Sequence, residues 1–121
     1  MEYLKSLKFN LKGQIMRSEK SVRIVLDEEK ILREGKYKLD ELYTYLDEIA
    51  KIAKLKKRDK YTYVADRDEN DMARLGIFTL NEAIENEAIT KNVKEWYWLK
   101  DGEISTDVIK SAKRCGDGVW E

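Results

Sequence analysis

The chain has one cysteine, no histidine and no proline among its 121 residues. A single cysteine cannot form an intramolecular disulfide. Without histidine, the usual zinc sites and the Ser-His-Asp and Cys-His catalytic arrangements cannot be assembled from this chain alone. Without proline, turns depend on glycine, asparagine and aspartate. Hydrophobic residues make up 42% of the sequence, enough for one compact core, so we expect a single domain over residues 1–121.

Charge is abundant but balanced. The chain carries 24 basic and 24 acidic residues, for a net charge of zero, and the two signs are interspersed. This balance favours neither nucleic acid nor an anionic membrane as a partner. The first ten residues lack the apolar run of a secretion signal, and the longest uncharged segment, residues 75–81, is far shorter than a membrane span. We therefore expect a cytoplasmic protein without a membrane segment.

The first third of the chain contains two candidate strands. Residues 7–11 alternate between apolar and polar side chains, which predicts a half-buried strand running on through Ile15. Ser21–Glu34 fits both a strand and a helix, because its apolar residues match either spacing. We expect a strand and then a turn around Glu28–Glu29. A helix ending at Gly35 is the alternative.

The clearest element is a helix from about Leu39 to Leu55. Its apolar residues recur on one stripe with a period of 3.6 residues. Acidic residues lie early in this segment and basic residues late, which suits the helix dipole. Residues 61–65 follow as an aromatic and β-branched strand.

Two shorter helices are predicted next. Asp68 can cap a helix that ends at Gly76. Thr79 and Glu82 have the spacing of a capping box, with Phe78 at the preceding staple position, and so predict a second helix start.

The last part of the chain predicts a strand and a final helix. Residues 93–99 form the strand, and a turn follows at residues 100–102. Thr106 or Asp107 can cap the helix, which Gly116 would end. Strands and helices thus alternate irregularly. This order predicts an α+β fold, a small and mostly antiparallel sheet with about three helices packed on one face.

The central part of the sequence is acidic. Residues 66–103 contain ten acidic and five basic side chains. The start of this stretch resembles a calcium-binding loop, but Asp71 stands where the loop needs glycine and Ile77 where it needs glutamate. A surface of this charge can attract a partner with a basic site.

Aromatic residues are densest at residues 96–98. On a strand, Trp96 and Trp98 share one face, which we expect to be core, and Tyr97 takes the other. Tyr97 and Trp120 are the better candidates for exposure. Tryptophan and tyrosine dominate the energetics of many interfaces, so Tyr97 is a candidate contact residue.

A basic patch offers a different hypothesis. Lys51–Lys60 contains six basic residues, with Tyr61 and Tyr63 beside them. Bases next to aromatic side chains can bind single-stranded nucleic acid. However, the bases also suit the end of the preceding helix, and the two tyrosines fall on one side of a strand and can be core.

No catalytic residue, metal ligand or cofactor is predicted. Cys115 falls on the apolar stripe of the last helix, and the chain has no histidine to activate its thiol. The abundant carboxylates do not single out a glycosidase-like pair, and carboxylate-based metal catalysis is an enzymatic alternative that the composition allows.

The sequence therefore favours a protein-binding inhibitor that is not an enzyme. The most concrete version is a bacterial immunity protein or antitoxin that occludes the active site of a cytosolic nuclease toxin. The alternatives are a phage-encoded antagonist of a host nuclease system, resembling an anti-CRISPR protein, and a nucleic-acid-binding accessory protein that uses the Lys51–Lys60 patch. The oligomeric state is not predicted. The residues expected to contact a partner with a basic surface are Asp66, Asp68, Glu69, Asp71, Glu82, Glu85 and Tyr97.

Overall fold

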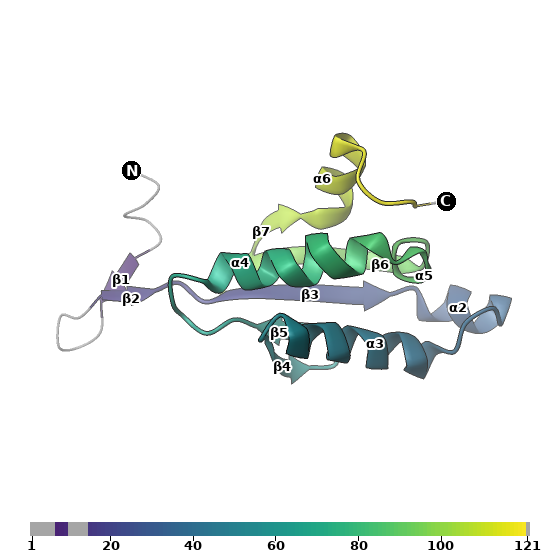
Figure 1. Cartoon of the computed structure of the whole chain (residues 1–121), viewed down its shortest axis with the longest axis horizontal. Coiled ribbons are helices and arrows are strands. Elements are labelled where there is room, and N and C mark those ends of the chain that lie inside the picture. The colour runs from purple at the N-terminus through teal and green to yellow at the C-terminus, as the bar shows by residue number, and fades with distance from the viewer. Residues whose placement is uncertain (1–6, 10–14, 121) are drawn as a thin grey trace.

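The computed structural model describes residues 7–9 and 15–120. Its centre is a five-stranded antiparallel sheet with the strand order β4-β5-β3-β6-β7. A separate hairpin, β1 and β2, lies at one end of the molecule beyond β3 (Figure 1). The strands are β1 (Leu7–Phe9), β2 (Ile15–Arg17), β3 (Lys20–Leu26), β4 (Lys56–Asp59), β5 (Thr62–Val64), β6 (Val93–Lys100) and β7 (Glu103–Asp107).

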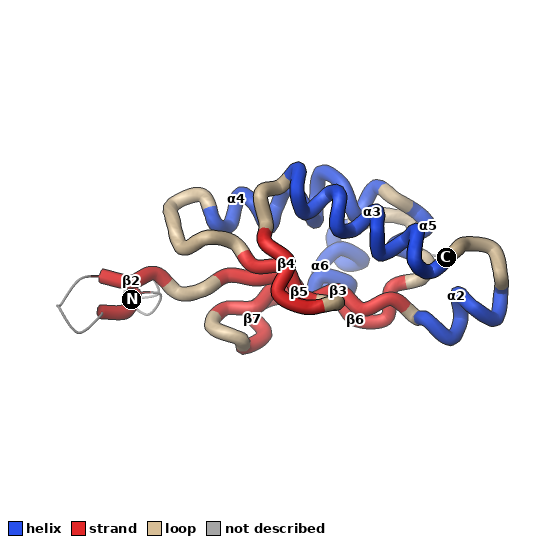
Figure 2. Tube along the Cα trace, turned by 90° about the horizontal axis from the view of Figure 1, so that it is seen from below, coloured by secondary structure: helices blue, strands red, loops and turns tan. Residues whose placement is uncertain are grey.

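The helices from α3 onward gather on one side of this sheet, and α2 lies beyond the end of β3 (Figures 1 and 2). Helix α3 and the run from α4 to α5 lie side by side over the sheet, and α6 lies beyond β7 on the same side (Figures 1 and 2). The predicted α+β fold, with helices on one face of an antiparallel sheet, is confirmed. The helices are α2 (Glu28–Glu34), α3 (Leu39–Ile52), α4 (Asp71–Gly76), the π-helix η1 (Ile77–Glu82), the 3-10 helix η2 (Ala83–Glu85), α5 (Glu87–Thr90) and α6 (Val108–Cys115).

Among the described residues, no helix has the length and apolar character needed to cross a membrane.

Alternation along β3 creates the core. Val22, Ile24 and Leu26 are at most 1% exposed and all point toward the helices. Trp96 on β6 stands directly opposite Ile24 and is fully buried, as the sequence predicted. The helices close the core with Leu42, Leu46 and Ile49 from α3 and with Leu75 and Phe78 from the α4–η1 run.

The predicted long helix is α3, and its end is well defined. It stops at Ile52, after which Lys54 takes a left-handed conformation with φ of 62°. The N–H of Leu55 then donates to the carbonyl of Ala50 at 2.8 Å. This arrangement is a Schellman-type end, and burying the leucine that follows the left-handed residue stabilises it.

Two predictions for residues 7–34 are wrong. Leu7–Phe9 pairs antiparallel with Ile15–Arg17, so the chain reverses instead of continuing as one strand; residues 10–14 lie outside the described part. The turn expected at Glu28–Glu29 is the first turn of α2. Asp27 caps that helix by accepting a hydrogen bond from the Lys30 N–H at 3.2 Å.

The helix break predicted between Gly76 and Thr79 is also absent. Gly76 has helical angles of −63° and −41°, so α4 runs directly into the π-helix η1. Thr79 is fully buried within that π-helix, and its hydroxyl accepts a hydrogen bond from Trp98 Nε1 at 2.9 Å. The threonine therefore binds the sheet instead of capping a helix.

The two edge strands were not predicted from the sequence, whereas the elements at the end of the chain were. Strands β4 and β7 are short and exposed and show no apolar alternation. Strand β6, the turn at residues 101–102 and helix α6 are all confirmed. Asp107 is the cap of α6, accepting from the Lys110 N–H at 3.1 Å, and Gly116 ends that helix in the left-handed conformation.

Two glycine substitutions test these helix boundaries with opposite signs. Alanine at Gly35, where φ is +63°, should lower the free energy of unfolding by about 1 kcal/mol. Alanine at Gly76 meets no atom within 4 Å and should raise it by up to about 1 kcal/mol, because alanine favours a helix interior. Urea denaturation measures both values. Destabilisation by Gly76→Ala would contradict the continuous helix.

Candidate functional site

The predicted acidic contact residues do not form one surface. Asp66, Asp68 and Glu69 lie in the loop between β5 and α4. Asp66 pairs with Lys56 at 2.9 Å and Asp68 with Arg74 at 2.6 Å. The hydrogen bond from Arg74 is the largest of the interactions that hold the pKa of Asp68 below its ordinary value. Two of the three carboxylates are therefore already matched by bases of the same chain.

Asp71 has a structural position that removes it from the candidate contact surface. Its side chain is only 1% exposed, at the first turn of α4. It accepts from the Met72 N–H at 2.7 Å and lies 3.4 Å from the ammonium of Lys20 on β3. The carboxylate therefore fixes the start of α4 to the sheet, and a partner cannot reach it in this conformation.

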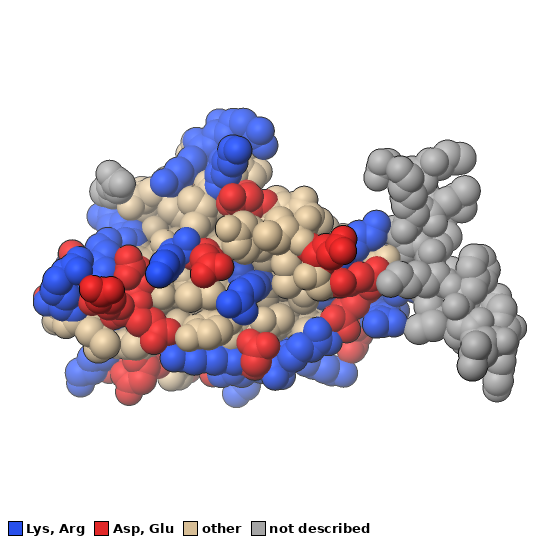
Figure 3. All heavy atoms as spheres, turned by 180° about the vertical axis from the view of Figure 1, so that it is seen from behind, with Lys and Arg blue, Asp and Glu red and all other residues tan. Residues whose placement is uncertain are grey.

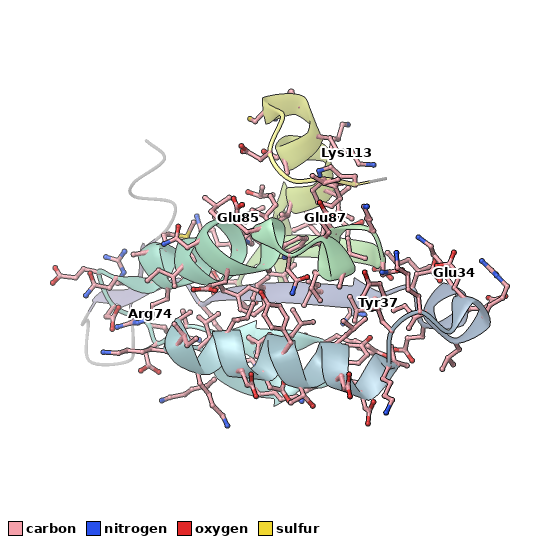
Figure 4. All side chains as sticks on the ribbon, turned by 45° about the vertical axis from the view of Figure 1, so that its right-hand side comes forward. Glu34, Tyr37, Arg74, Glu85, Glu87 and Lys113 are labelled. Carbon is pink, nitrogen blue, oxygen red and sulfur yellow. The ribbon has the colours of Figure 1, made fainter. Side chains whose placement is uncertain are left out.

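The remaining three predicted residues lie on opposite sides of the sheet. Glu82 and Glu85 belong to the end of the helical run above the sheet, where Figure 4 shows Glu85 near Glu87. Tyr97 points away from the helices, because it alternates along β6 with the buried Trp96. A single partner face cannot contain all seven residues.

The basic patch is largely paired within the chain. Lys56 bridges to Asp66, and Lys57 lies 3.0 Å from Asp47 of α3. Arg58 forms two hydrogen bonds with Glu19, at 2.6 and 2.7 Å. Tyr63 beside the patch is core, at 1% exposure. These pairs reduce the positive charge available for a nucleic-acid backbone, so the structure lends that alternative no support.

Lys60, the last base of the Lys51–Lys60 patch, belongs to a cluster around Glu28. The carboxylate accepts hydrogen bonds from the hydroxyls of Tyr43 at 2.8 Å and Tyr61 at 3.1 Å, and from Lys60 Nζ at 3.3 Å. The Tyr43 hydrogen bond is the main cause that lowers the pKa of Glu28, against the effect of burial. Burial, followed by the bond to Glu28, raises the pKa of Tyr43.

Chemically, this cluster suits structure better than catalysis. A general base at neutral pH needs a carboxylate pKa raised toward 7 or a tyrosine pKa lowered toward it, and both shifts here run the other way. The cluster instead joins α2, α3 and the β4–β5 turn. Elsewhere in the described part of the chain, no three or more acidic or cysteine side chains are grouped to hold a metal ion.

The face of the sheet opposite the helices is the best candidate for a binding surface. We call it the open face. None of the described helices covers it (Figures 1 and 2). It carries the side chains of β3, β5, β6 and β7 that alternate with the core residues, namely Ser21, Arg23, Val25, Thr62, Val64, Glu95, Tyr97, Leu99 and Ile104.

The strand register arranges these side chains in cross-strand rows. One row runs Val64, Ser21, Leu99, Ile104 across four strands, and three of its four members are apolar. Ile104 ends this row and is 62% exposed. An uncovered face of an antiparallel sheet is normally polar. The apolar row departs from this pattern, with Val64 and Leu99 half-buried and its exposed surface concentrated at Ile104.

Tyr97 and Arg23 stand at the centre of the next row. They are direct cross-strand neighbours, with Thr62 on the far side of Arg23. Both are half-buried, and no hydrogen bond of the Tyr97 hydroxyl is found within the described residues. Figure 3 shows uncharged side chains across the middle of this face, with charged ones scattered among them and gathered along its margins. Tyrosine and arginine are enriched at the energetic centres of interfaces.

The sequence contained part of the signal for this face. Alternation along β6 placed Tyr97 correctly on the side opposite Trp96 and Trp98. It missed Leu99, Val64 and Ile104, because their grouping depends on strand order and register. Residues 96–99 are all apolar or aromatic, so a strand there has such side chains on both of its faces. This was the available signal for an apolar outer face.

Comparisons with known proteins leave the site to be interpreted from its geometry: no protein-family model matches the sequence, and no curated protein matches it either.

The Glu28 cluster gives a pH-dependent prediction. The pKa of Glu28 in the fold lies below the ordinary value of 4.5, so its ionised form stabilises the fold above about pH 4.5. That contribution is lost as the pH falls through the folded pKa. Tyr43→Phe removes the strongest donor and should raise the Glu28 pKa more than Tyr61→Phe does.

Carboxyl carbon NMR titration of the two variants measures this order directly. Equal pKa values in both variants would contradict the leading role of the Tyr43 hydroxyl.

Proposed function

We propose that this protein binds another protein through the open face and inhibits it by occlusion, without performing chemistry of its own. The most concrete version is an immunity protein or antitoxin that covers the active site of a cytosolic nuclease toxin. The observation that carries the proposal is the placement of Tyr97 beside Arg23, next to an apolar row on an uncovered sheet face.

The open face has the composition of a protein interface. Aromatic and arginine side chains at its centre can fill pockets and donate hydrogen bonds on a partner. Its charged residues are mixed, with Arg23 near the middle and Glu95 opposite Val25. Affinity would therefore come from the apolar row and Tyr97, and a dense set of phosphate-mimicking carboxylates is not needed.

The acidic loop takes a second role in this proposal. Glu69 is exposed and forms no ion pair with a described residue, whereas Asp66 and Asp68 are paired with Lys56 and Arg74 and contribute less to the field of the loop. Charges at the margin of an interface mainly change the association rate, because they act before contact is made. The loop would steer a basic toxin toward the protein, and the open face would hold it.

The first test compares the two layers of the molecule. Tyr97→Asp places a charge at the centre of the open face and should weaken capture of the partner from host lysate by about 30-fold or more, the size of a hot-spot loss. Glu85→Lys on the helical layer is the matched control and should leave capture unchanged. Thermal unfolding checks that both variants fold. Retained capture by Tyr97→Asp, with loss in Glu85→Lys, would overturn the assignment.

The second test separates steering from affinity. Asp68→Asn with Glu69→Gln removes two loop charges while keeping the Asp68 side chain as an acceptor for the Asn70 N–H. Association with the captured partner should slow severalfold at low salt and depend less on salt, with little change in dissociation. Stopped-flow kinetics at two salt concentrations measures this. Unchanged association would remove the loop from the mechanism.

A further inference from the structure

A small apolar pocket opens on the helical side of the sheet, away from the open face. It lies between α6, the π-helix η1 and strands β6 and β7, and its volume is about 230 Å³. Its apolar walls are Leu80, Trp98, Val108 and Ala112, and Asp117 adds one carboxylate to its lining. The indole N–H of Trp98 is already bonded to Thr79. The pocket therefore offers apolar surface without an unsatisfied donor at Trp98.

The π-helix shapes this pocket. The wide turn of residues 77–82 directs Thr79 inward against Trp98, while the next residue, Leu80, lies at the wall and remains 49% exposed. Single π-helical turns inside longer helices occur often at functional sites. Here the turn leaves a large apolar side chain half exposed beside a cavity.

A polar groove continues from the pocket along α6. The two hollows share Thr106 and Ser111. The groove is also lined by Lys110 and Arg114, which are exposed and form no ion pair with any described residue. Its one acid, Asp107, is occupied in capping α6. With two bases against one acid, the groove carries a net charge of plus one beside the pocket.

We propose that this pocket and groove bind a short acidic segment of a partner protein. One large apolar side chain of the segment fills the pocket, and its carboxylates lie against Lys110 and Arg114. The volume suits a single side chain, since a cavity of about 150 Å³ already holds benzene and pockets for free small molecules span roughly 300–1,000 Å³. Lys110 and Arg114 select acidic neighbours on the groove side, which Asp117 does not line.

This site goes beyond the open-face proposal and does not depend on it. The pocket lies on the side of the sheet opposite Tyr97, because Trp98 alternates along β6 with Tyr97. The groove reaches the end of β7, where Asp107 is the cross-strand partner of Tyr97. Lys113 takes no part in the groove. Its ammonium lies 5.6 Å from the ring centre of Trp120, and Figure 4 shows it on α6 near the C-terminal segment.

Cys115 makes the site measurable. It is the one cysteine of the chain, it is exposed, and it lines the pocket. A bound segment should shield its thiol from alkylation. The indole signal of Trp98 gives an independent readout, because its N–H points at Thr79 in the pocket wall.

The test uses three capped pentapeptides: Glu-Asp-Phe-Asp-Glu, the basic Lys-Lys-Phe-Lys-Lys, and Glu-Asp-Gly-Asp-Glu without the anchor. The acidic phenylalanine peptide should shift the Trp98 indole signal in NMR. At about four times its Kd, it should slow iodoacetamide alkylation of Cys115 about fivefold. Lys110→Glu with Arg114→Glu should transfer this effect to the basic peptide. Lys51→Glu with Lys54→Glu, at the end of α3, is the matched control and should change nothing.

Several results would overturn the proposal. They are the absence of both effects up to about 10 mM peptide, equal effects of the glycine peptide, and an unchanged preference in the Lys110/Arg114 variant. Binding of 4-phenylbutyrate without binding of the peptide would identify a small-molecule site instead, and would equally reject the partner segment. Because the assay uses no lysate partner, its result is independent of the result of the open-face experiments.

Discussion

The whole structure depends on the placement of its helices on one side of the sheet. Strand β3 is the centre of that arrangement, since it pairs with β5 on one side and with β6 on the other. Its buried residues Val22, Ile24 and Leu26, with Trp96 opposite, form the floor on which α3 and the α4–η1 run pack. Burying such side chains is worth about 2 kcal/mol or more each. The same one-sided packing leaves the open face without cover.

Polar contacts then fix the helices above this floor. Asp71 ties the start of α4 to Lys20, and Thr79 ties the π-helix to Trp98. The Glu28 cluster joins α2 and α3 to the β4–β5 turn. Titratable and hydroxyl side chains of this kind are common in functional sites. Here each of them instead joins one structural element to another. Residues left free by this scheme, such as Tyr97 on one side and Lys110 on the other, are the better candidates for binding.

How far the sequence could predict this structure depends on the type of signal. Periodic burial and local caps predicted α3, β6 and α6, because both act within a few residues of one another. The capping-box pattern at Thr79 misled, since the threonine finds its partner in Trp98 on a different element. The candidate site depended on register even more strongly. Only strand pairing brings Leu99 beside Ile104, and only tertiary packing buries Asp71 among the acidic residues that resembled a surface.

The most direct test of the central claim is hydroxyl-radical footprinting of the whole protein, alone and in host lysate, read by mass spectrometry. If the open face is the contact surface, oxidation of Tyr97, Leu99 and Ile104 should fall in the lysate, while Ile52 on the outer side of α3, at 62% exposure, should be unaffected. Unchanged oxidation of Tyr97, with protection confined to the helical layer, would contradict the account.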